Sequence, residues 1–335
     1  MGKKDNNFDN FNPAIDVKNI FNNYSDKEIF SHYLKQPVSK SRKYHAPYRN
    51  DKVASCTMSY SNGRWWFRDW GYDSKPYDVI EFVQKIHNLS FKKALQKIYF
   101  DLDLQQSPSI NNTNKRVTSK SKKSIIKITT KSFTKGDKRY LSSYGINRQL
   151  CNKYRVYSIQ KAISHNNSKR YEYIYHKKDP ALGYYFGRDT RGNQKWKIYF
   201  YKRPKDTMRF MCNTSRIQGW VQIPNSYKLL INTKSLKDVM CIDKLGYPAI
   251  APQAENFMYY DYIIDELKSR FNNIITLYDN DDAGIRWAKK LYNKYNIPHM
   301  FLDKHKDISD LIKSKNIIYA KQKLKCLIQS TLFSI

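Results

Sequence analysis

Apolar and polar stretches alternate most regularly in the last third of the chain. From residue 227 onward, four short apolar runs typical of strands (YKLLIN, YPAIAP, NIITLY and HMFL) are separated by stretches with helical periodicity. The predicted helices cover 235–245, 257–271, 283–295 and a segment that begins at Ser309. Strands that alternate with helices of this length predict a compact, mostly parallel α/β sheet. Ligands of such sheets bind at the carboxyl ends of the strands.

The first hundred residues follow a different pattern. Residues 14–36 predict one or two helices, with a capping box in the Ser-Asp-Lys-Glu segment at 25–28. Two β-like runs within 44–70 flank the Ser-Asn-Gly sequence at 61–63, which is typical of a hairpin turn. Helical periodicity returns at 77–102. We therefore expect a small α+β module.

The remaining stretches complete a four-part organisation. Residues 105–124 are polar, basic and nearly free of large apolar side chains, so they predict a linker. The segment after them begins with helical periodicity and then becomes rich in β-like runs. The expected parts are a module at 1–104, the linker at 105–124, a basic region at 125–226 and the α/β domain at 227–335. The expected fold class is α/β for the C-terminal domain and α+β for the chain as a whole.

Charge narrows the choice of partner. The chain has 61 Lys and Arg residues against 29 Asp and Glu, a formal net charge of +32. Nucleic acid is the expected partner, because each phosphate that Lys or Arg neutralises releases counterions. A coding bias toward Lys explains part of the excess, but it would also raise the acidic codons and so does not explain the imbalance.

The positions of the cysteines and the hydropathy of the chain argue against several kinds of site and of protein. The five cysteines form no C-x-x-C pair, which excludes a zinc site built from cysteines and argues against a disulfide framework. The N-terminus lacks the apolar core of a signal peptide, and no run approaches the roughly 20 apolar residues of a membrane span. We expect a protein of the bacterial or phage-infected host cytoplasm, without a membrane association.

Acidic residues follow the third apolar run of the C-terminal domain. NIITLY leads directly into Asp279-Asn280-Asp281-Asp282-Ala283-Gly284. Carboxylates at Asp279 and Asp281 would lie at the carboxyl end of a strand, where a bound Mg²⁺ offsets their repulsion. Gly284 would let the backbone turn tightly into the next helix. The structural alternative is that Asp282 caps that helix and the other acids are solvated.

This strand–DxDxxG–helix segment, preceded by a strand and TKSLKDVMCIDKLGY, resembles the Toprim domain of bacterial and phage DNA primases and topoisomerases. In that family the first strand ends in a Glu, and an Asp follows four residues later. Asp238 matches the Asp, whereas Lys234 stands at the Glu position. A lysine does not ligate Mg²⁺ but can hold a phosphate. The resemblance implies a Rossmann-like fold and a catalytic set of Lys234, Asp238, Asp279 and Asp281.

A third acidic segment, KHKDISDLI, resembles the corresponding motif of primases. Asp307 and Asp310 match it as candidates for a second metal ion, and the structural alternative is a helix cap at Asp310 or Ser309. The resemblance thus implies Mg²⁺ or Mn²⁺ as cofactor, held by Asp279, Asp281, Asp307 and Asp310. In primer synthesis two such ions would clamp the incoming triphosphate and the attacking hydroxyl.

The middle region extends the resemblance. YLSSYGINRQLCNKYRVYSI is similar to the helical segment that opens a primase polymerase region, and KWKIYFYKRPKDTMRFMCN is similar to its basic strands. An exposed alternating strand face is the structural alternative. The interleaved aromatic residues favour nucleic acid, because bases stack on aromatic rings while cations hold the backbone. The residues expected to contact it are Lys195, Lys197, Lys202, Arg203 and Arg209.

The N-terminal module resembles the zinc ribbon of primases without its ligands. Ala46 and Arg49 stand where the family has Cys and His, and Phe67 and Trp70 replace the second ligand pair. We therefore expect no zinc, and a ribbon held by the packing of aromatic side chains, among them a buried Trp66 and Trp70. Residues expected to contact single-stranded template are Arg49, Lys52, Arg64, Trp65 and Arg68.

The leading hypothesis is a DNA primase that makes short RNA primers on single-stranded DNA from nucleoside triphosphates, in phage or mobile-element replication. One alternative is a catalytically inactive Toprim protein that binds DNA and recruits other replication proteins, which Lys234 favours. A Toprim nuclease is a third hypothesis. No G-x-x-x-x-G-K-[ST] motif occurs, so a helicase or polymerase partner would be a separate chain.

Overall fold

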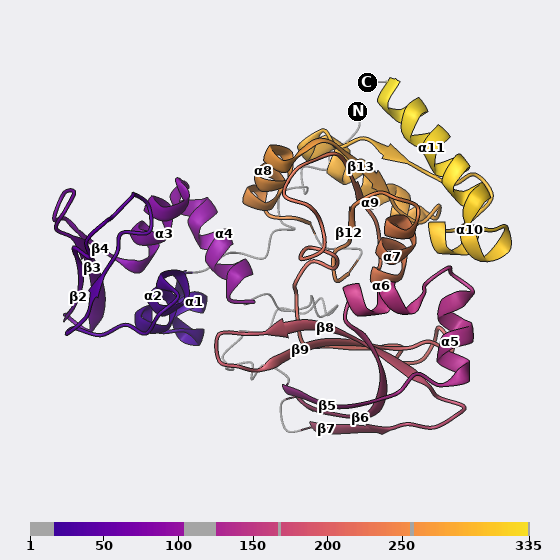
Figure 1. The fold of residues 1–335 in the computed structure, drawn as a ribbon, viewed down its shortest axis with the longest axis horizontal. Coiled ribbons are helices and arrows are strands. Elements are labelled where there is room, and N and C mark those ends of the chain that lie inside the picture. The colour runs from indigo at the N-terminus through magenta and orange to yellow at the C-terminus, as the bar shows by residue number, and fades with distance from the viewer. Residues whose placement is uncertain (1–16, 104–124, 167–168, 255–257, 334–335) are drawn as a thin grey trace, which may run out of the picture. The chain divides into compact units, whose positions relative to one another are not determined.

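The computed structural model describes residues 17–103, 125–166, 169–254 and 258–333 (Figure 1). The predicted linker at 105–124 lies wholly outside these described residues. The chain divides into two compact units: the smaller comprises residues 1–105 and 260–262, and the larger comprises residues 106–259 and 263–335. None of the described helices is both long enough and apolar enough to cross a membrane.

The smaller unit is an antiparallel sheet with helices on one side of it (Figure 1). The sheet order is β1-β2-β3-β4, with β1 at Lys43–Tyr44, β2 at Cys56–Ser61, β3 at Arg64–Asp69 and β4 at Pro76–Tyr77. The helices are α1 at Val17–Asn23, α2 at Asp26–Leu34, α3 at Val79–His87 and α4 at Phe91–Asp101. One apolar core joins the two layers, with Phe30, Phe67 and Phe82 fully buried at its centre. The predicted α+β module is confirmed.

Local sequence signals set the ends of these elements. The capping box at Ser25 and Glu28 is present, with each side chain bonded to the backbone of the other residue. Asn62 and Gly63 both have positive φ, 51° and 76°, as the tight turn between β2 and β3 requires. The predicted hairpin is therefore confirmed, and its register places Phe67 toward the core.

The larger unit begins with an antiparallel sheet. Its order is β10-β9-β8-β6-β5, and β7 pairs with β6. The strands are β5 at Ile125–Lys131, β6 at Val156–Asn166, β7 at Lys169–Ile174, β8 at Ala181–Arg188, β9 at Gln194–Phe200 and β10 at Phe210–Cys212. Two helices, α5 at Lys135–Ser142 and α6 at Arg148–Lys153, connect β5 to β6. This matches the predicted change from helical to β-rich character.

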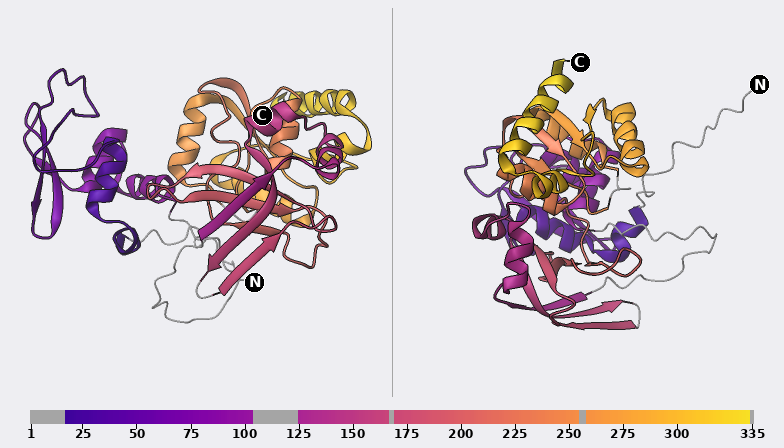
Figure 2. Two further views of the ribbon diagram at one scale, coloured as in Figure 1. Left: turned by 60° about the horizontal axis from the view of Figure 1, so that its bottom comes forward. Right: turned by 90° about the vertical axis from the view of Figure 1, so that its right-hand side faces the viewer.

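A parallel sheet with flanking helices completes the larger unit (Figure 2). Its order is β12-β11-β13-β14, with β11 at Tyr227–Asn232, β12 at Ala249–Ile250, β13 at Phe271–Leu277 and β14 at His299–Met300. The helices are α7 at Leu236–Lys244, α8 at Asp261–Arg270, α9 at Asp282–Tyr295, α10 at Ile308–Ser314 and α11 at Ile317–Phe333. All three strand pairings are parallel, which confirms the predicted mostly parallel sheet.

The apolar core of the larger unit runs across both sheets. It includes Leu150 and Tyr184 of the antiparallel region together with Ile231, Ile275 and Leu311 of the parallel one. Residues on both sides of the expected boundary at 226/227 therefore share one apolar core.

Candidate active site

The acidic loop at the carboxyl end of β13 leads straight into α9. Asp281 is the N-cap of this helix, and its carboxylate accepts a hydrogen bond from the backbone N–H of Gly284 at 3.0 Å. This bond, reinforced by Lys306, lowers the pKa of Asp281. The alternative that Asp282 caps the helix is wrong: Asp282 is the first residue within it and is exposed.

Two lysines neutralise the paired carboxylates. Asp279 is 2% exposed, and its Oδ2 lies 2.7 Å from Lys234 Nζ and 3.4 Å from Lys306 Nζ. Lys306 Nζ also lies 3.0 Å from Asp281 Oδ2. The other oxygen of Asp279, Oδ1, is buried and has no hydrogen-bond partner among the described residues. The formal charges of these four side chains sum to zero. We call the set of Lys234, Lys306, Asp279 and Asp281 the Lys–Asp cluster.

The backbone explains why these residues meet. β11 and β13 are adjacent and parallel, so the loops after both strands lie at one edge of the sheet. Asn280 ties this edge to the segment before α10, since its N–H donates to Lys306 O at 3.0 Å and its side-chain amide donates to Leu302 O at 2.9 Å. Gly284 lets the start of α9 approach the backbone of Asp279 closely, because an added Cβ there would collide with the Asp279 carbonyl oxygen.

Two further acids, the buried Asp238 and the partly buried Asp307, form a second pair beside the cluster. Burial, followed by the nearby Asp307 carboxylate, raises the pKa of Asp238 to about 6. Asp307 is the N-cap of α10 and accepts hydrogen bonds from the Ser309 hydroxyl at 2.5 Å and the Asp310 N–H at 2.7 Å. The Asp310 side chain is exposed. Asp238 and Asp307 are thus brought together, whereas Asp310 contributes a backbone contact to this pair.

The donor set decides which metal chemistry the site can support. No group of three or more His, Cys, Asp and Glu side chains that could hold a metal ion occurs within the described ranges. Mg²⁺ is commonly held by one or two carboxylates, with water and substrate phosphates as its other ligands. Asp279 and Asp281 fit that arrangement, because Asp279 keeps a buried oxygen without a protein partner. The cluster therefore fits a divalent ion that enters together with a phosphate-bearing substrate.

The basic residues expected in the middle region fall into two groups. Lys195 is buried and paired with Asp189 at 3.3 Å, and Lys197 is buried with its Nζ 3.0 Å from Gln253 O. Burial lowers the pKa of Lys197. In this structure these two side chains support the sheet and do not present charge to solvent.

The other basic residues of the middle region lie nearer the surface. Arg203 is paired with Asp179, Arg209 donates to the Tyr199 hydroxyl at 2.6 Å, and Lys202 is exposed. Lys202 is accordingly the freest of the five to reach a phosphate.

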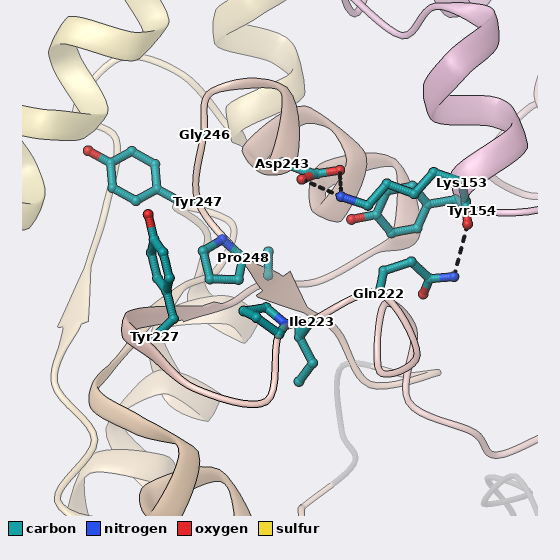
Figure 3. A pocket seen from close by; sticks show the side chains of 11 residues that line it. Lys153, Tyr154, Gln222, Ile223, Tyr227, Asp243, Gly246, Tyr247 and Pro248 are labelled. Atoms are coloured by element: carbon teal, nitrogen blue, oxygen red, sulfur yellow. Dashed lines mark hydrogen bonds and ion pairs between the residues drawn. The ribbon is translucent and has the colours of Figure 1, made fainter.

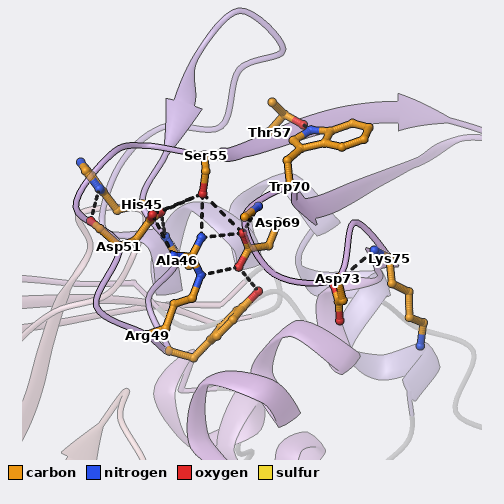
Figure 4. A network of polar contacts seen from close by, with 12 residues as sticks. His45, Ala46, Arg49, Asp51, Ser55, Thr57, Asp69, Trp70, Asp73 and Lys75 are labelled. Carbon is orange, nitrogen blue, oxygen red and sulfur yellow. Dashed lines mark hydrogen bonds and ion pairs between the residues drawn. The ribbon is translucent and has the colours of Figure 1, made fainter.

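Arg49 stands at the centre of a polar network in the smaller unit (Figure 4). Its guanidinium donates to both carboxylate oxygens of Asp69, at 2.9 and 2.7 Å, to Asp51 at 3.0 Å and to the Ser55 hydroxyl at 2.7 Å. Arg49 and the Tyr48 hydroxyl hold the pKa of Asp69 well below its usual range. The guanidinium thus links the loop before β2 to the end of β3 by hydrogen bonds, in addition to the expected packing of aromatic side chains.

The tryptophans of the hairpin are arranged differently from expectation. Trp70 is 56% exposed, and the Arg68 guanidinium lies 4.8 Å from its ring centroid. Trp66 is only partly buried, and Trp65 packs against the apolar core. The prediction that Trp66 and Trp70 are buried is wrong, because the hairpin register turns Phe67 inward and the position after β3 outward. Of the three rings, Trp70 offers the most surface to a nucleobase.

The remaining basic positions of the smaller unit are Lys52 and Arg64, which are both exposed. The Arg64 guanidinium lies 5.4 Å from the Phe21 ring centroid. These two residues remain available for the predicted contact with a phosphate backbone.

Two surface cavities lie apart from the Lys–Asp cluster. A cavity of about 200 Å³ opens at the amino end of β11, bordered by Tyr227 and by the Lys153–Asp243 ion pair of 2.7 Å (Figure 3). A second cavity, of about 370 Å³, has a basic lining that includes Lys131, Arg148 and Arg155. Neither is lined by the acids at the carboxyl end of β13.

A comparison with known protein families gives a match in the region of the parallel sheet. Residues 235–312 match the Toprim-like family. They form a Toprim-like domain. This range holds all five predicted acids, and Lys234 lies one residue before it. No curated protein matches the chain.

Several solved primase structures share part of the backbone arrangement. The Escherichia coli primase catalytic core is 15% identical, covers 56% of this chain and 72% of its own, and has a TM-score of 0.41. The zinc-binding and RNA polymerase domains of the Aquifex aeolicus primase are 13% identical, with coverages of 85% and 81% and a TM-score of 0.43. The primase fragment of the bacteriophage T7 primase-helicase protein is 15% identical, with coverages of 83% and 98% and a TM-score of 0.37.

Proposed function

We propose that the chain is a DNA primase that joins ribonucleotides on single-stranded DNA. The observation that carries this proposal is the Lys–Asp cluster at the carboxyl edge of a Toprim-like sheet. It combines carboxylates suited to a divalent cation with ammonium groups suited to phosphates. A nucleoside triphosphate brings both requirements to one place.

Each group of the cluster has a distinct task in this proposal. Asp279 and Asp281 would hold Mg²⁺, which when bound polarises phosphoryl oxygens and offsets charge that develops on them. Lys234 and Lys306 orient the triphosphate and stabilise the negative charge of the displaced pyrophosphate. Asp238, whose pKa of about 6 lies near neutrality, is suited to take up a proton at its buried Oδ1.

Template binding is assigned to the basic and aromatic residues outside the cluster. Exposed Trp70 replaces Trp65 as the proposed base-stacking residue, with Arg68 beside it. Lys52, Arg64 and Lys202 are proposed to contact the phosphate backbone. We further propose that the protein serves phage or mobile-element replication with a helicase or polymerase supplied by a separate chain.

The ion pair of Lys234 with Asp279 favours a second candidate function. A Toprim-like domain whose carboxylates are already neutralised could serve only to bind DNA and recruit replication proteins. That protein would keep single-stranded DNA binding but would have no use for Asp279 and Asp281.

Incorporation of labelled ribonucleotides on single-stranded DNA separates the two candidates. The double variant Asp279→Asn, Asp281→Asn removes both carboxylates at nearly constant volume, and we expect it to lower incorporation at least 100-fold. Asp303→Asn is the matched control, because Asp303 is 72% exposed and pairs with Lys323, which is not a member of the cluster. Equal incorporation by wild type and the double variant would contradict nucleotidyl transfer at this site.

A further inference from the structure

Lys234 and Lys306 already satisfy the carboxylates that would otherwise attract a cation. Both ammonium groups lie within 3.4 Å of the buried Asp279 Oδ2, and Lys306 reaches Asp281 as well. At such distances, and with Asp279 almost fully buried, the attraction is only partly weakened by water. A divalent cation that arrives alone must therefore displace two cations that are tethered to the chain.

The charge balance of the cluster changes when a triphosphate arrives with the cation. The cluster sums to zero as it stands, and a lone divalent cation would leave it with two excess positive charges. A nucleoside triphosphate carries about four negative charges, so a cation and a triphosphate entering together take the cluster from zero to about −2. The cation then offsets the carboxylates, both lysines can pair with phosphate oxygens, and the remaining negative charge is favourable in a chain of net charge +32. The lysines then gain phosphate partners in exchange for the carboxylates they release.

The exposure of the side chains permits this exchange. The Lys306 side chain is 50% exposed and the Lys234 side chain 28% exposed, whereas the Asp279 side chain is 3% exposed. The flexible cations can therefore move while the carboxylate stays in place. The unpartnered Asp279 Oδ1 is a ligand position that the lysines leave open.

We propose that Lys234 and Lys306 are exchangeable counter-cations that couple metal binding to triphosphate binding. Without nucleotide they neutralise Asp279 and Asp281 and keep a divalent cation out. When a triphosphate binds they move to its phosphate oxygens, and the carboxylates then take the cation. This inference rests on the proposed function and adds to it a mutual dependence of the two ligands, which by linkage must be reciprocal.

Mn²⁺ binding in the absence of nucleotide tests the proposal, with electron paramagnetic resonance as the readout. The double variant Lys234→Gln, Lys306→Gln should bind one Mn²⁺ at least tenfold more tightly than wild type. The gain should vanish when Asp279→Asn is added. Lys323→Gln is the matched control, because Lys323 forms a 3.0 Å pair with an exposed aspartate outside the cluster and should leave Mn²⁺ binding unchanged.

A second measurement keeps the test independent of folding and of catalysis. Binding of a fluorescent, non-hydrolysable ribonucleoside triphosphate to wild type should tighten at least tenfold when Mg²⁺ is added, and this dependence should shrink in the lysine double variant. Equal Mn²⁺ affinity of wild type and the lysine variant would overturn the inference even if primers are made. If the lysine variant gains Mn²⁺ affinity but the wild-type protein makes no primers, the inference stands and the proposed function is contradicted instead.

Discussion

Arg49 links separate segments of the smaller unit through directed hydrogen bonds. Its guanidinium bonds to Asp51, Ser55 and Asp69, which lie on the loop before β2 and at the end of β3. A zinc ion links loops through four ligands, and a guanidinium with five N–H donors can link them through directed hydrogen bonds. Gly71 leaves room for this side chain, because an added Cβ would meet Arg49 Nη2.

Replacing Arg49 by Ala should loosen the smaller unit. Asp69 is buried and would lose its cation, and an uncompensated buried charge destabilises the fold strongly. We expect the backbone amides of β2 and β3 to exchange with solvent at least tenfold faster, measured by hydrogen exchange with mass spectrometry. Lys75→Ala is the control, because it removes an ion pair with Glu81 in which both side chains are well exposed.

The same network predicts how protection of these amides depends on pH. The folded pKa of Asp69 is lowered below its unfolded value of about 3.9. Its contribution to stability is therefore present above about pH 4 and is lost as the pH falls toward the folded pKa. Protection of β2 and β3 should fall over that acid range in wild type and respond much less in the Arg49→Ala variant. Identical protection of the two proteins at neutral pH would show that the network does not hold the hairpin.

At the scale of elements, sequence patterns located the strands and helices well. β13 and α9 followed from an apolar run and a helical period, both of which are local signals. The expected strand at 247–252 pairs with β11 only at Ala249–Ile250, since pairing depends on a neighbouring strand and not on hydropathy alone. The order β12-β11-β13-β14 could not be read from the sequence, because it is set by packing between distant segments.

Contacts between distant segments also limited what the sequence could predict about the candidate site. Asp279, Asp281 and Lys234 were found from spacing and resemblance, whereas Lys306 was missed although it stands within KHKDISD. Its role depends on a loop that the Asn280 backbone and side chain hold against β13. The direction of Trp70 was likewise decided by hairpin register, which hydropathy does not encode.

Gly284 offers a test of the strand–loop–helix element. A change to Ala would favour the helix by about 1 kcal/mol in open space. Here the new Cβ would collide with the Asp279 carbonyl, and forced overpacking costs about 1–3 kcal/mol. The collision should win because a backbone atom cannot rotate away, so we expect a lower midpoint of thermal unfolding and weaker binding of Mg²⁺ with triphosphate. Gly136→Ala in the first turn of α5 is the control, since its nearest neighbour would lie at 3.6 Å. It should leave stability unchanged or raise it.

At the scale of the whole molecule, a strongly basic chain contains a small site in which charge is balanced. The net charge of +32 favours binding of a polyanion, while the charges of the Lys–Asp cluster sum to zero. The continuous core of the larger unit fixes the loops after β11 and β13 and the segment before α10 in one rigid frame. We therefore propose that general affinity for nucleic acid and selective binding of a nucleotide are separate properties of the chain.

The position of a bound metal ion tests the central claim most directly. Fe²⁺ can replace Mg²⁺, and with peroxide it generates radicals that cut the backbone near the ion. With a non-hydrolysable ribonucleoside triphosphate present, we predict cuts in three segments, 232–238, 278–284 and 303–309, and none of these in the Asp279→Asn, Asp281→Asn variant. Cuts confined to other segments, or cuts in these three that persist in the variant, would contradict the assignment of this edge of the sheet as the nucleotide site.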